Sequence, residues 1–410
     1  MPPLPAVSPE MQLVLCCARI DLDHAQTDRL QRLLAWPLDW ERLMALAARH
    51  GLFPLLYRHL VAQPSFPVAE LVPEDAGRRL HLAYLQNVAN TLVLSDELGN
   101  ILAALDAADI PAIPYKGVAL GEQLYGDPTL RVSGDIDVIV PRERVMAARD
   151  RLTARGYVPL HTLTPRQEKT YLAGIHHYNL IHREKAVSVE IHWDIVGPQY
   201  AMPVGWPGLW RRTGRVDLYL GAEEARAARV FASEDLLLLL LIHGSKHRWE
   251  ALKWLVDVGL LIHRNPNLDW NVLMDRASQW RAERMALLGL YLAHELLDAP
   301  LPPWLWQRVN QDGSVRSLAA EVTALCDQTM AEGLVSDYSR IVFVMRMRER
   351  WRDRFAYGWR LLTHLNFQDI DRDDRPEPFY YLRRPVRLIR KNGWAAMSRI
   401  VGQMVAALGR

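Results

Sequence analysis

Residues 133–140 read SGDIDVIV, and this stretch decides the fold of the middle of the chain. It alternates acidic and apolar residues and then turns fully apolar before Pro141, which predicts a strand with a polar start and a buried end. Because residues two apart on a strand point to the same face, Asp135 and Asp137 would present two carboxylates side by side. Such like charges repel unless a cation lies between them, and Mg²⁺ binds carboxylate and phosphate oxygens. The stretch therefore predicts a divalent-cation site; the plain alternative is a strand start with two solvated aspartates.

A second acidic strand is predicted at residues 187–194, which read VSVEIHWD. Glu190, His192 and Asp194 fall on one face of it, and apolar residues fall on the other. An antiparallel neighbour would bring Glu190 to the cation as a third carboxylate, where it is either a metal ligand or a general base. Asp194 is the rival for that role, and His192 either orients an acceptor, binds a phosphate or packs as a core histidine. The alternative is a solvated polar strand face.

The residues at the start of the next upstream helix suit a phosphate group. Lys116-Gly117 follows a short extended segment at 110–115 and precedes a helix predicted at 118–125. Glycine lets the backbone approach a phosphate, the helix start offers free N–H groups, and Lys116 adds a charge. The pair is not a Walker loop, which requires GxxxxGK[ST], and an ordinary surface lysine is the alternative.

Three residues between that helix and the acids complete the predicted phosphate site. Arg131 can fork onto the β- or γ-phosphate of a triphosphate. Ser133 and Gly134 lie in the turn that leads directly into the acidic strand. We therefore expect all three to contact a nucleotide.

A further group of candidate residues lies in the second half of the chain, where residues 243–249 read HGSKHRW. Lys246 and Trp249 are three positions apart, and Lys253, Trp254 and Asp257 follow on the next predicted helix, so several of them can face one cleft. A lysine would meet a phosphate and a tryptophan would stack on a base. The alternative is a helix junction in which the tryptophan packs and the lysines are solvated.

The hydrophobic pattern divides the chain into three parts. Residues 1–108 are predicted to be helical, residues 109–220 to form a small mixed α/β unit, and residues 221–410 to be helical again. Strands are expected at 176–182 and 187–195, around a hairpin turn. The expected fold class is therefore α+β, with a small mixed sheet flanked by N-terminal and C-terminal helical regions. Helices are expected at residues 40–51, 79–108, 142–155, 233–248, 250–263, 270–279 and 282–297.

Composition narrows the class of protein. Half of the 410 residues are hydrophobic and 23% are charged, which is typical of a globular chain. The 49 basic and 47 acidic residues give a net charge of +2, which disfavours a dedicated nucleic-acid coat. The three cysteines form no CxxC pair, so neither a zinc site nor a disulfide framework is expected. The N-terminus lacks a signal-peptide pattern and the longest apolar run, 236–242, is too short for a bilayer, so we expect a cytoplasmic protein without a transmembrane segment.

Arginines crowd two segments near the end of the chain, at residues 340–360 and 383–391. Aromatic residues are interleaved in the first segment, and such a pattern suits RNA, an acidic membrane surface or a partner protein. Glu349 and Asp353 allow pairing at helical spacing, so the alternative is a solvated helix face.

Together these residues resemble the bacterial uncharacterised nucleotidyltransferase family, within the nucleotidyltransferase superfamily that has a polymerase-β-type fold. The family pattern runs as a lysine–glycine pair, a tyrosine, an arginine, DIDxxV and an E-x-H-W strand. The resemblance extends to residues 49–51 and 379–385 and so covers most of the chain. The counterparts of the pattern here are Lys116-Gly117, Tyr125, Arg131, and residues 135–140 and 190–193.

The resemblance implies transfer of a nucleotidyl group from a nucleoside triphosphate, with ATP as the first choice, onto a hydroxyl group with release of pyrophosphate. Asp135, Asp137 and Glu190 would hold two Mg²⁺ ions, with Mn²⁺ as an alternative. The acceptor is RNA, a protein, a peptide or a small metabolite, and the near-neutral charge disfavours long RNA. Commoner members carry glycine–serine where this chain has Lys116-Gly117, and many carry aspartate where it has Glu190.

Two rival functions remain open at this point. One is a non-catalytic nucleotide-binding or scaffold protein on the same fold, which the intact acidic residues disfavour. The other is a kinase that transfers the γ-phosphate, and the released product would separate it from a nucleotidyltransferase.

Overall fold

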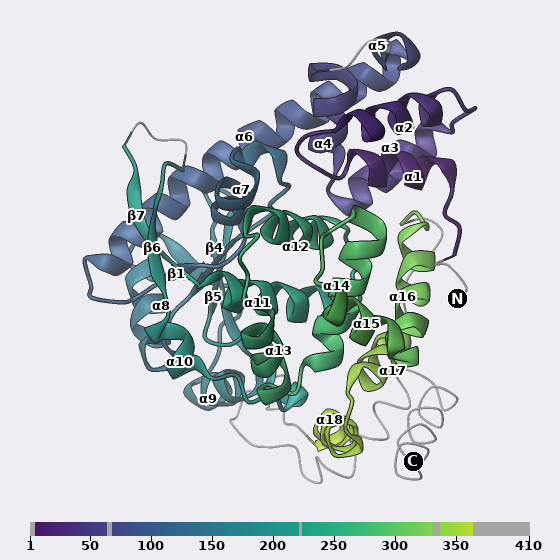
Figure 1. Ribbon diagram of the computed structural model, residues 1–410. Helices are drawn as coiled ribbons and strands as arrows, with labels where there is room; N and C mark the ends of the chain where they lie inside the picture. The colour runs from purple at the N-terminus through teal and green to yellow at the C-terminus, as the bar shows by residue number, and fades with distance from the viewer. Residues whose placement is uncertain (1–4, 64–67, 221–223, 331–336, 364–410) are drawn as a thin grey trace.

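The computed structural model describes residues 5–63, 68–220, 224–330 and 337–363 (Figure 1). A small mixed sheet lies on one side of the molecule, and helices from both ends of the chain pack against it and beside it. This arrangement confirms the predicted α+β class. Within the described ranges, no helix is both long enough and apolar enough to cross a bilayer.

The central sheet has five strands in the order β1-β2-β5-β4-β3. β2 pairs with β5 in parallel, and the other neighbours are antiparallel. The three predicted strands are confirmed as β2, β4 and β5, whereas β3 is too short to show a hydrophobic period and was not predicted. The bounds are β1 (Ile113–Pro114), β2 (Ile136–Ile139), β3 (Tyr157–Pro159), β4 (His177–His182) and β5 (Val187–His192).

Helices form most of the remaining described chain, and local chemistry sets their ends. Asp39 accepts the N–H of Arg42 at the start of α3, and Gly51 ends that helix with a left-handed φ of 66°. The α-helices before the central strands are α1 (Pro9–Cys17), α2 (His24–Leu34), α3 (Trp40–His50), α4 (Phe53–Tyr57), α5 (Val68–Leu71) and α6 (Glu74–Asp106). Those within and after the sheet are α7 (Gly117–Tyr125), α8 (Val145–Thr153), α9 (Pro165–Gly174), α10 (Trp206–Arg211), α11 (Ser233–Lys246), α12 (Lys253–Arg264), α13 (Trp270–Gln279), α14 (Glu283–Leu297), α15 (Pro303–Gln311), α16 (Gly313–Cys326), α17 (Asp337–Met347) and α18 (Trp351–Thr363).

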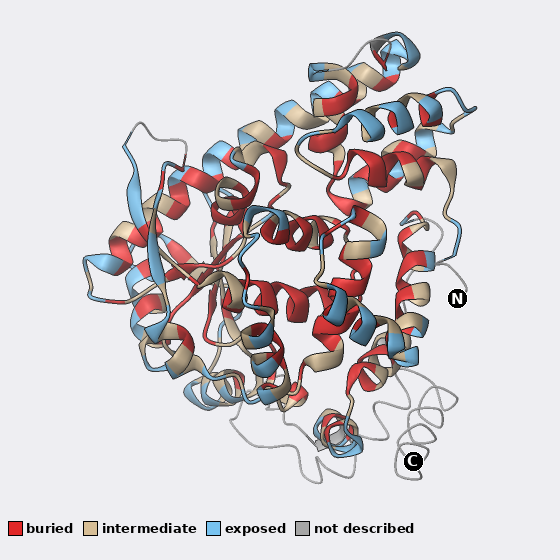
Figure 2. Ribbon diagram, viewed as in Figure 1, coloured by how far each residue is buried: buried red, intermediate tan, exposed pale blue. Residues whose placement is uncertain are grey.

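Two hydrophobic cores hold these elements together. One joins the second half of α6 to the sheet and α8, through residues such as Leu98, Val138 and Val189. The other joins α1–α4 to α11–α16, and Figure 2 shows how completely α11 and α14 are buried. Both cores combine parts of the chain on either side of residue 108, while the division of the chain at 108 and 220 stays a prediction.

A two-stranded hairpin that was not predicted lies beside the sheet. It consists of β6 (Gly214–Leu218) and β7 (Arg226–Val230), and β7 contacts β1. The hairpin follows the mixed α/β segment and crosses residue 220. Its arginines interrupt the apolar alternation, which is why its period was not recognised.

Trp249 is completely buried at the end of the apolar helix α11. Its ring packs directly against two glycines, Gly244 and Gly289. A Cβ atom on Gly244 would lie 2.2 Å from the ring and one on Gly289 would lie 2.6 Å from it, so neither position has room for a side chain. Arg248 and Trp249 both have positive φ, in the turn that follows α11. Trp249 is therefore a packing residue of the second core.

The Gly289→Ala variant tests this packing. Its Cβ would also lie 2.4 Å from Leu241 Cδ2, and overpacking of this kind lowers the free energy of unfolding by about 1–3 kcal/mol. The matched control is Gly259→Ala in α12, whose Cβ would meet Leu297 at an ordinary 3.5 Å and should raise stability by up to about 1 kcal/mol through helix propensity. Denaturant unfolding measures both, and equal stability of the two variants would contradict the packing.

His50 joins the N-terminal helices to the C-terminal ones. Its Nε2 lies 2.8 Å from the carbonyl oxygen of Cys326 and its Nδ1 accepts the N–H of Leu252 at 3.2 Å. The neutral ring therefore satisfies both partners, whereas a second ring proton would face the Leu252 N–H. Burial lowers the pKa of His50 from 6.5 to about 4.

This pKa predicts loss of stability in mild acid. The unfolded chain binds the His50 proton below pH 6.5 and the folded chain does so only near pH 4, so stability falls as pH drops between these values. From pH 7 to pH 5 the His50 contribution is about 2 kcal/mol. Because other histidines are also buried, the measurement is the difference in pH slope between wild type and His50→Gln. Identical slopes would show that His50 does not titrate in this way.

Candidate functional site

A polar cavity of about 340 Å³ lies between the sheet and the helical half of the chain. Its lining comes from the start of α7, the start of β2, the end of β5, the end of α11 and the start of α12. A volume of this size is within the range of small-ligand sites. The lining residues are Lys116, Gly117, Arg131, Ser133, Gly134, Asp135, Asp137, His176, His177, Glu190, His192, His243, Lys246, His247, Lys253 and Trp254.

The structure brings the three predicted carboxylates to this one cavity. Asp137 on β2 is the register partner of Glu190 on β5, and Asp135 immediately precedes β2. The strands are parallel, so the expectation of an antiparallel neighbour for Glu190 was wrong. The reason is topological: α8, β3, α9 and β4 lie between β2 and β5 in the chain and return it to the same end of the sheet. Asp194, the rival acid, does not line the cavity, and its Oδ1 accepts the N–H of Ile195 at 2.7 Å.

Two basic groups hold Asp137 within the cavity wall. Lys116 Nζ lies 3.1 Å and His192 Nε2 lies 2.7 Å from the same oxygen, Oδ1. His192 Nε2 also lies 3.0 Å from Glu190 Oε2, so this ring stands between the two carboxylates. Burial raises the pKa of Asp137, but the charge of Lys116 and the hydrogen bond from His192 outweigh burial and lower that pKa below its usual value. Asp137 is therefore ionised at neutral pH.

The neighbouring acids differ in their titration. Burial raises the pKa of Asp135, and the like charge of Asp137 raises it further. Burial also raises the pKa of Glu190, but its hydrogen bond with His192 outweighs burial, so the net pKa is lowered. Burial lowers the pKa of His192, whereas its hydrogen bonds to Asp137 and Glu190 raise it above its usual value overall. Divalent cations bind where several carboxylates lie together and the neighbouring positive charges do not balance them.

Two more lysines line the cavity from the helical half. Lys246 Nζ donates to the carbonyl of Ile195 at 2.8 Å, and Lys253 Nζ donates to the carbonyl of Val132 at 3.0 Å. Burial and the charge of Lys116 lower the pKa of Lys246 to about 7. Burial, followed by the charge of Arg131, lowers the pKa of Lys253 to about 8. The cavity therefore combines carboxylates with closely spaced lysines, an arrangement that suits a cation and a phosphate chain together.

Arg131 lines the cavity, but its guanidinium is bound to the protein. Nε and Nη2 donate to the two carboxylate oxygens of Asp257 at 2.9 Å, and Nη1 lies 3.3 Å from Gly117 O and from Ser133 Oγ. Both partners of this ion pair are almost fully buried. The fork predicted for a phosphate is thus occupied by Asp257, and Arg131 links Gly117 to Ser133 through Nη1.

Gly117 lies close to the backbone of the acidic strand, while its predicted approach to a phosphate stays a prediction. Gly117 has a φ of 59°, and a Cβ there would stand 3.2 Å from the carbonyl oxygen of Asp135. Ser133 is buried and its carbonyl accepts from Asn90 at 2.8 Å, whereas Gly134 is exposed. Gly117, Ser133 and Gly134 all line the cavity.

Trp249 is the predicted nucleotide residue that the structure does not bring to the cavity. It is buried in the second core because glycines accept its ring, and Trp254 lines the cavity instead.

Four histidines that sequence reasoning missed also line the cavity: His176, His177, His243 and His247. The adjacent pair at 176–177 and the four-residue spacing of His243 and His247 at the end of α11 were the signals that could have found them.

The arginine-rich segment at 340–360 makes contacts within the protein. Arg340 pairs with Glu250 in the segment before α12, and Arg346 pairs with Glu321 in α16. These pairs are not at helical spacing, and Asp353 is buried and pairs with Arg281, so the expected pairing within a solvated helix face is not what Asp353 makes. The second cluster, at 383–391, and the resembling segment at 379–385 lie outside the described residues.

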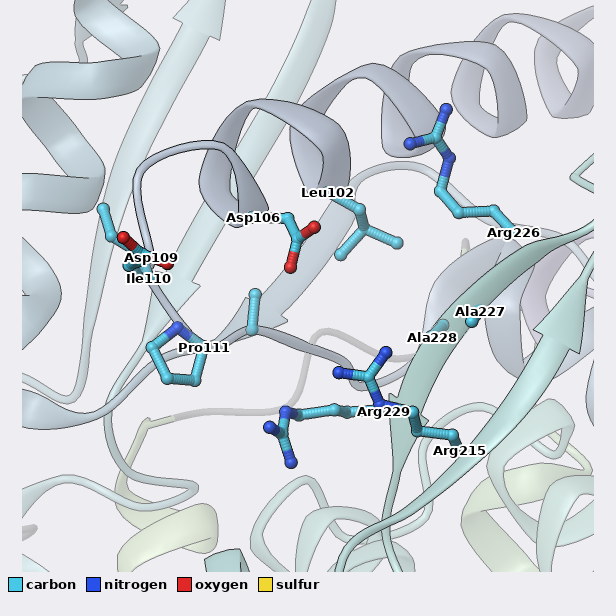
Figure 3. A pocket seen from close by; sticks show the side chains of 11 residues that line it. Leu102, Asp106, Asp109, Ile110, Pro111, Arg215, Arg226, Ala227, Ala228 and Arg229 are labelled. Atoms are coloured by element: carbon cyan, nitrogen blue, oxygen red, sulfur yellow. The ribbon is translucent and has the colours of Figure 1, made fainter.

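Another hollow, of about 230 Å³, lies between the end of α6 and the β6–β7 hairpin (Figure 3). Arg215 and Arg229 face each other across the hairpin and line this hollow together with Asp106. None of the predicted site residues lines it.

The Arg131–Asp257 pair yields a stability prediction. Asp257→Ala should lower the free energy of unfolding by about 3–5 kcal/mol, because it leaves a buried guanidinium without its carboxylate. The control is Asp75→Ala, which removes an exposed ion pair with Arg78 and should cost less than about 1 kcal/mol. Denaturant unfolding compares them, and a double Arg131→Met, Asp257→Leu variant should recover part of the loss. If Asp257→Ala is as stable as its control, Arg131 is not held as described.

Comparison with known proteins completes the description. A family model described as "Uncharacterised nucleotidyltransferase" matches residues 37–298, which is more than half of the 410-residue chain. No curated protein and no solved structure matches the chain. The matched range contains the acidic strands and all the lysines of the cavity. The chain therefore belongs to the uncharacterised nucleotidyltransferase family.

Proposed function

We propose that this cavity transfers a nucleotidyl group from a nucleoside triphosphate, ATP first, to a hydroxyl acceptor and releases pyrophosphate. The observation that carries the proposal is the meeting of two kinds of charge in one cavity. Asp137 and Glu190 are register partners on adjacent strands, and lysines of α11 and α12 line the same space. A cation bound to carboxylates beside a lysine-held phosphate chain is what phosphoryl displacement requires.

The acidic residues suit the magnesium that the family implies. Asp135, Asp137 and Glu190 are oxygen donors, and burial together with the like charge of Asp137 raises the pKa of Asp135. We propose that these three residues hold two Mg²⁺ ions, with Mn²⁺ as the alternative. When bound, the ions would offset the carboxylate charge and polarise phosphate oxygens.

The remaining residues have roles that follow from their positions. Lys116, Lys246 and Lys253 hold the phosphates as point charges, and the backbone N–H groups at the start of α7 add to this grip. Glu190, with a lowered pKa, is ionised and accepts the proton of the acceptor hydroxyl. The hydroxyl oxygen forms a bond to the α-phosphorus while the bond to the β-phosphate oxygen breaks, and pyrophosphate leaves with that electron pair.

The acceptor and the setting are proposed more broadly. A protein, a peptide or a small metabolite fits the near-neutral net charge of +2 better than long RNA does. Three buried free thiols, Cys16, Cys17 and Cys326, suit a reducing cytoplasm.

A labelling experiment tests the transfer. Purified protein with Mg²⁺ and ATP labelled at the α-phosphate should release pyrophosphate or become labelled itself. The Asp135→Ala, Asp137→Ala double variant should lose this activity because the cation loses its ligands. The control is Asp194→Asn, which changes a carboxylate outside the cavity and should keep the activity.

Two outcomes would replace the proposal with its rivals. Label transferred only from the γ-phosphate would establish a kinase. Equal ATP binding by wild type and the double variant, with no pyrophosphate from either, would establish a nucleotide-binding scaffold.

A further inference from the structure

Three histidine side chains converge in the cavity beside the carboxylates. His176 precedes β4, His177 begins it, and His192 ends β5 as the register partner of His177. One ring nitrogen from each lies within 4.8 Å of the others. The ring centroids are 4.6 Å apart for His176 and His177 and 5.1 Å apart for His177 and His192. All three residues line the cavity.

The free nitrogens of this cluster are unusual for buried groups. Within the described residues, Nδ1 of His177 and Nδ1 of His192 are both buried without a hydrogen-bond partner. Buried polar atoms in folded proteins are nearly always paired, so an orphan of this kind calls for a missing partner. Both orphan nitrogens belong to register-paired residues of the histidine cluster.

The carboxylates fix which nitrogen of His192 is available. His192 Nε2 lies 2.7 Å from Asp137 Oδ1 and 3.0 Å from Glu190 Oε2, so a hydrogen on Nε2 is donated to a carboxylate. In the neutral ring the lone pair is then on Nδ1. A histidine that binds metal through one nitrogen commonly donates its other N–H to a carboxylate, which orients the ring. Asp137 and Glu190 would thus position His192 as well as holding their own cation.

We propose that His176, His177 and His192 form a second metal position, which binds a transition-metal ion of the Zn²⁺ class. Imidazole nitrogens favour such ions, whereas Mg²⁺ prefers oxygen donors, so ligand type separates this position from the carboxylates. An ion bound to Nδ1 of His192 takes the place of a proton there. The inference rests on the proposed function in one respect, because His192 is shared with the wall that holds Mg²⁺.

This position was not visible in the sequence. The expectation of no zinc site rested on the absence of a CxxC pair, and it concerns cysteine ligands. Here the ligands are imidazoles, and His192 reaches the other two only through the pairing of β4 with β5. Lys246 Nζ lies 3.4 Å from His176 Nε2 and opposes a cation, whereas Asp137 and Glu190 offset that charge.

Metal titration of the full chain tests the proposal without any activity assay. Metal-stripped protein is titrated with Co²⁺, followed by its visible absorption, and Zn²⁺ is then added as a competitor. We expect Co²⁺ to bind and Zn²⁺ to displace it. Millimolar Mg²⁺ should leave the Co²⁺ spectrum unchanged. Wild type that binds neither Co²⁺ nor Zn²⁺, or Co²⁺ that Mg²⁺ displaces, would overturn the proposal whatever the variants do.

Variants assign the ligands. His176→Gln and His177→Gln should each weaken Co²⁺ binding about tenfold or more, since each loses a ligand. His81→Gln removes an exposed histidine on α6 and is the matched control, with unchanged binding expected. Circular dichroism checks that each variant is folded. Unchanged Co²⁺ affinity in both folded cluster variants would contradict the assignment.

One further variant separates this inference from the proposed function. Asp135→Asn should abolish nucleotidyl transfer and leave Co²⁺ binding intact, because Asp135 is not part of the histidine cluster. Histidine-dependent Co²⁺ binding in a chain that transfers no nucleotide would sink the function and keep the metal position. Magnesium-dependent transfer in a chain that binds no Co²⁺ would do the reverse.

Discussion

Parallel pairing of β2 with β5 is the constraint on which the site depends. It makes Asp137 and Glu190 neighbours in the wall of one cavity. Paired strands lie about 4.8 Å apart, and two unit charges about 5 Å apart repel by about 3 kcal/mol at an effective dielectric constant of about 20. An exposed ion pair contributes less than that, so the compensating groups must be buried beside the acids. Lys116 and His192 meet this requirement, since both contact Asp137 Oδ1.

The helical half of the chain is part of the site, because it fixes the backbone that presents the acids. Asp257 on α12 holds Arg131, which in turn contacts Gly117 and Ser133. The same helix begins with Lys253, which binds the carbonyl of Val132. A shift of α12 would therefore move the start of α7 and the segment that leads into β2 together.

Local signals in the sequence predicted the parts of the site whose chemistry lies within one element. The strand with Asp135 and Asp137, the Lys116-Gly117 helix start and the Glu190 strand were all found because a period of two and a helix start are properties of a few adjacent residues. The sequence did not reveal the direction of the strands, the partner of Arg131 or the burial of Trp249. Each of these depends on contacts between residues far apart in the chain. Asp257 lies 126 positions from Arg131, and no local pattern connects them.

The occupied fork of Arg131 also decides which cations can serve a phosphate. A guanidinium bound through both arms to one carboxylate cannot leave without exposing a buried charge, which costs about 3–5 kcal/mol. A lysine ammonium has three donors and no fixed plane, so it can keep its protein partner and still reach a phosphate oxygen. Lys246 and Lys253 are each held by a backbone carbonyl, and Lys116 by Asp137. We therefore propose that the lysines rather than the arginine supply the positive charge for a nucleotide in this cavity.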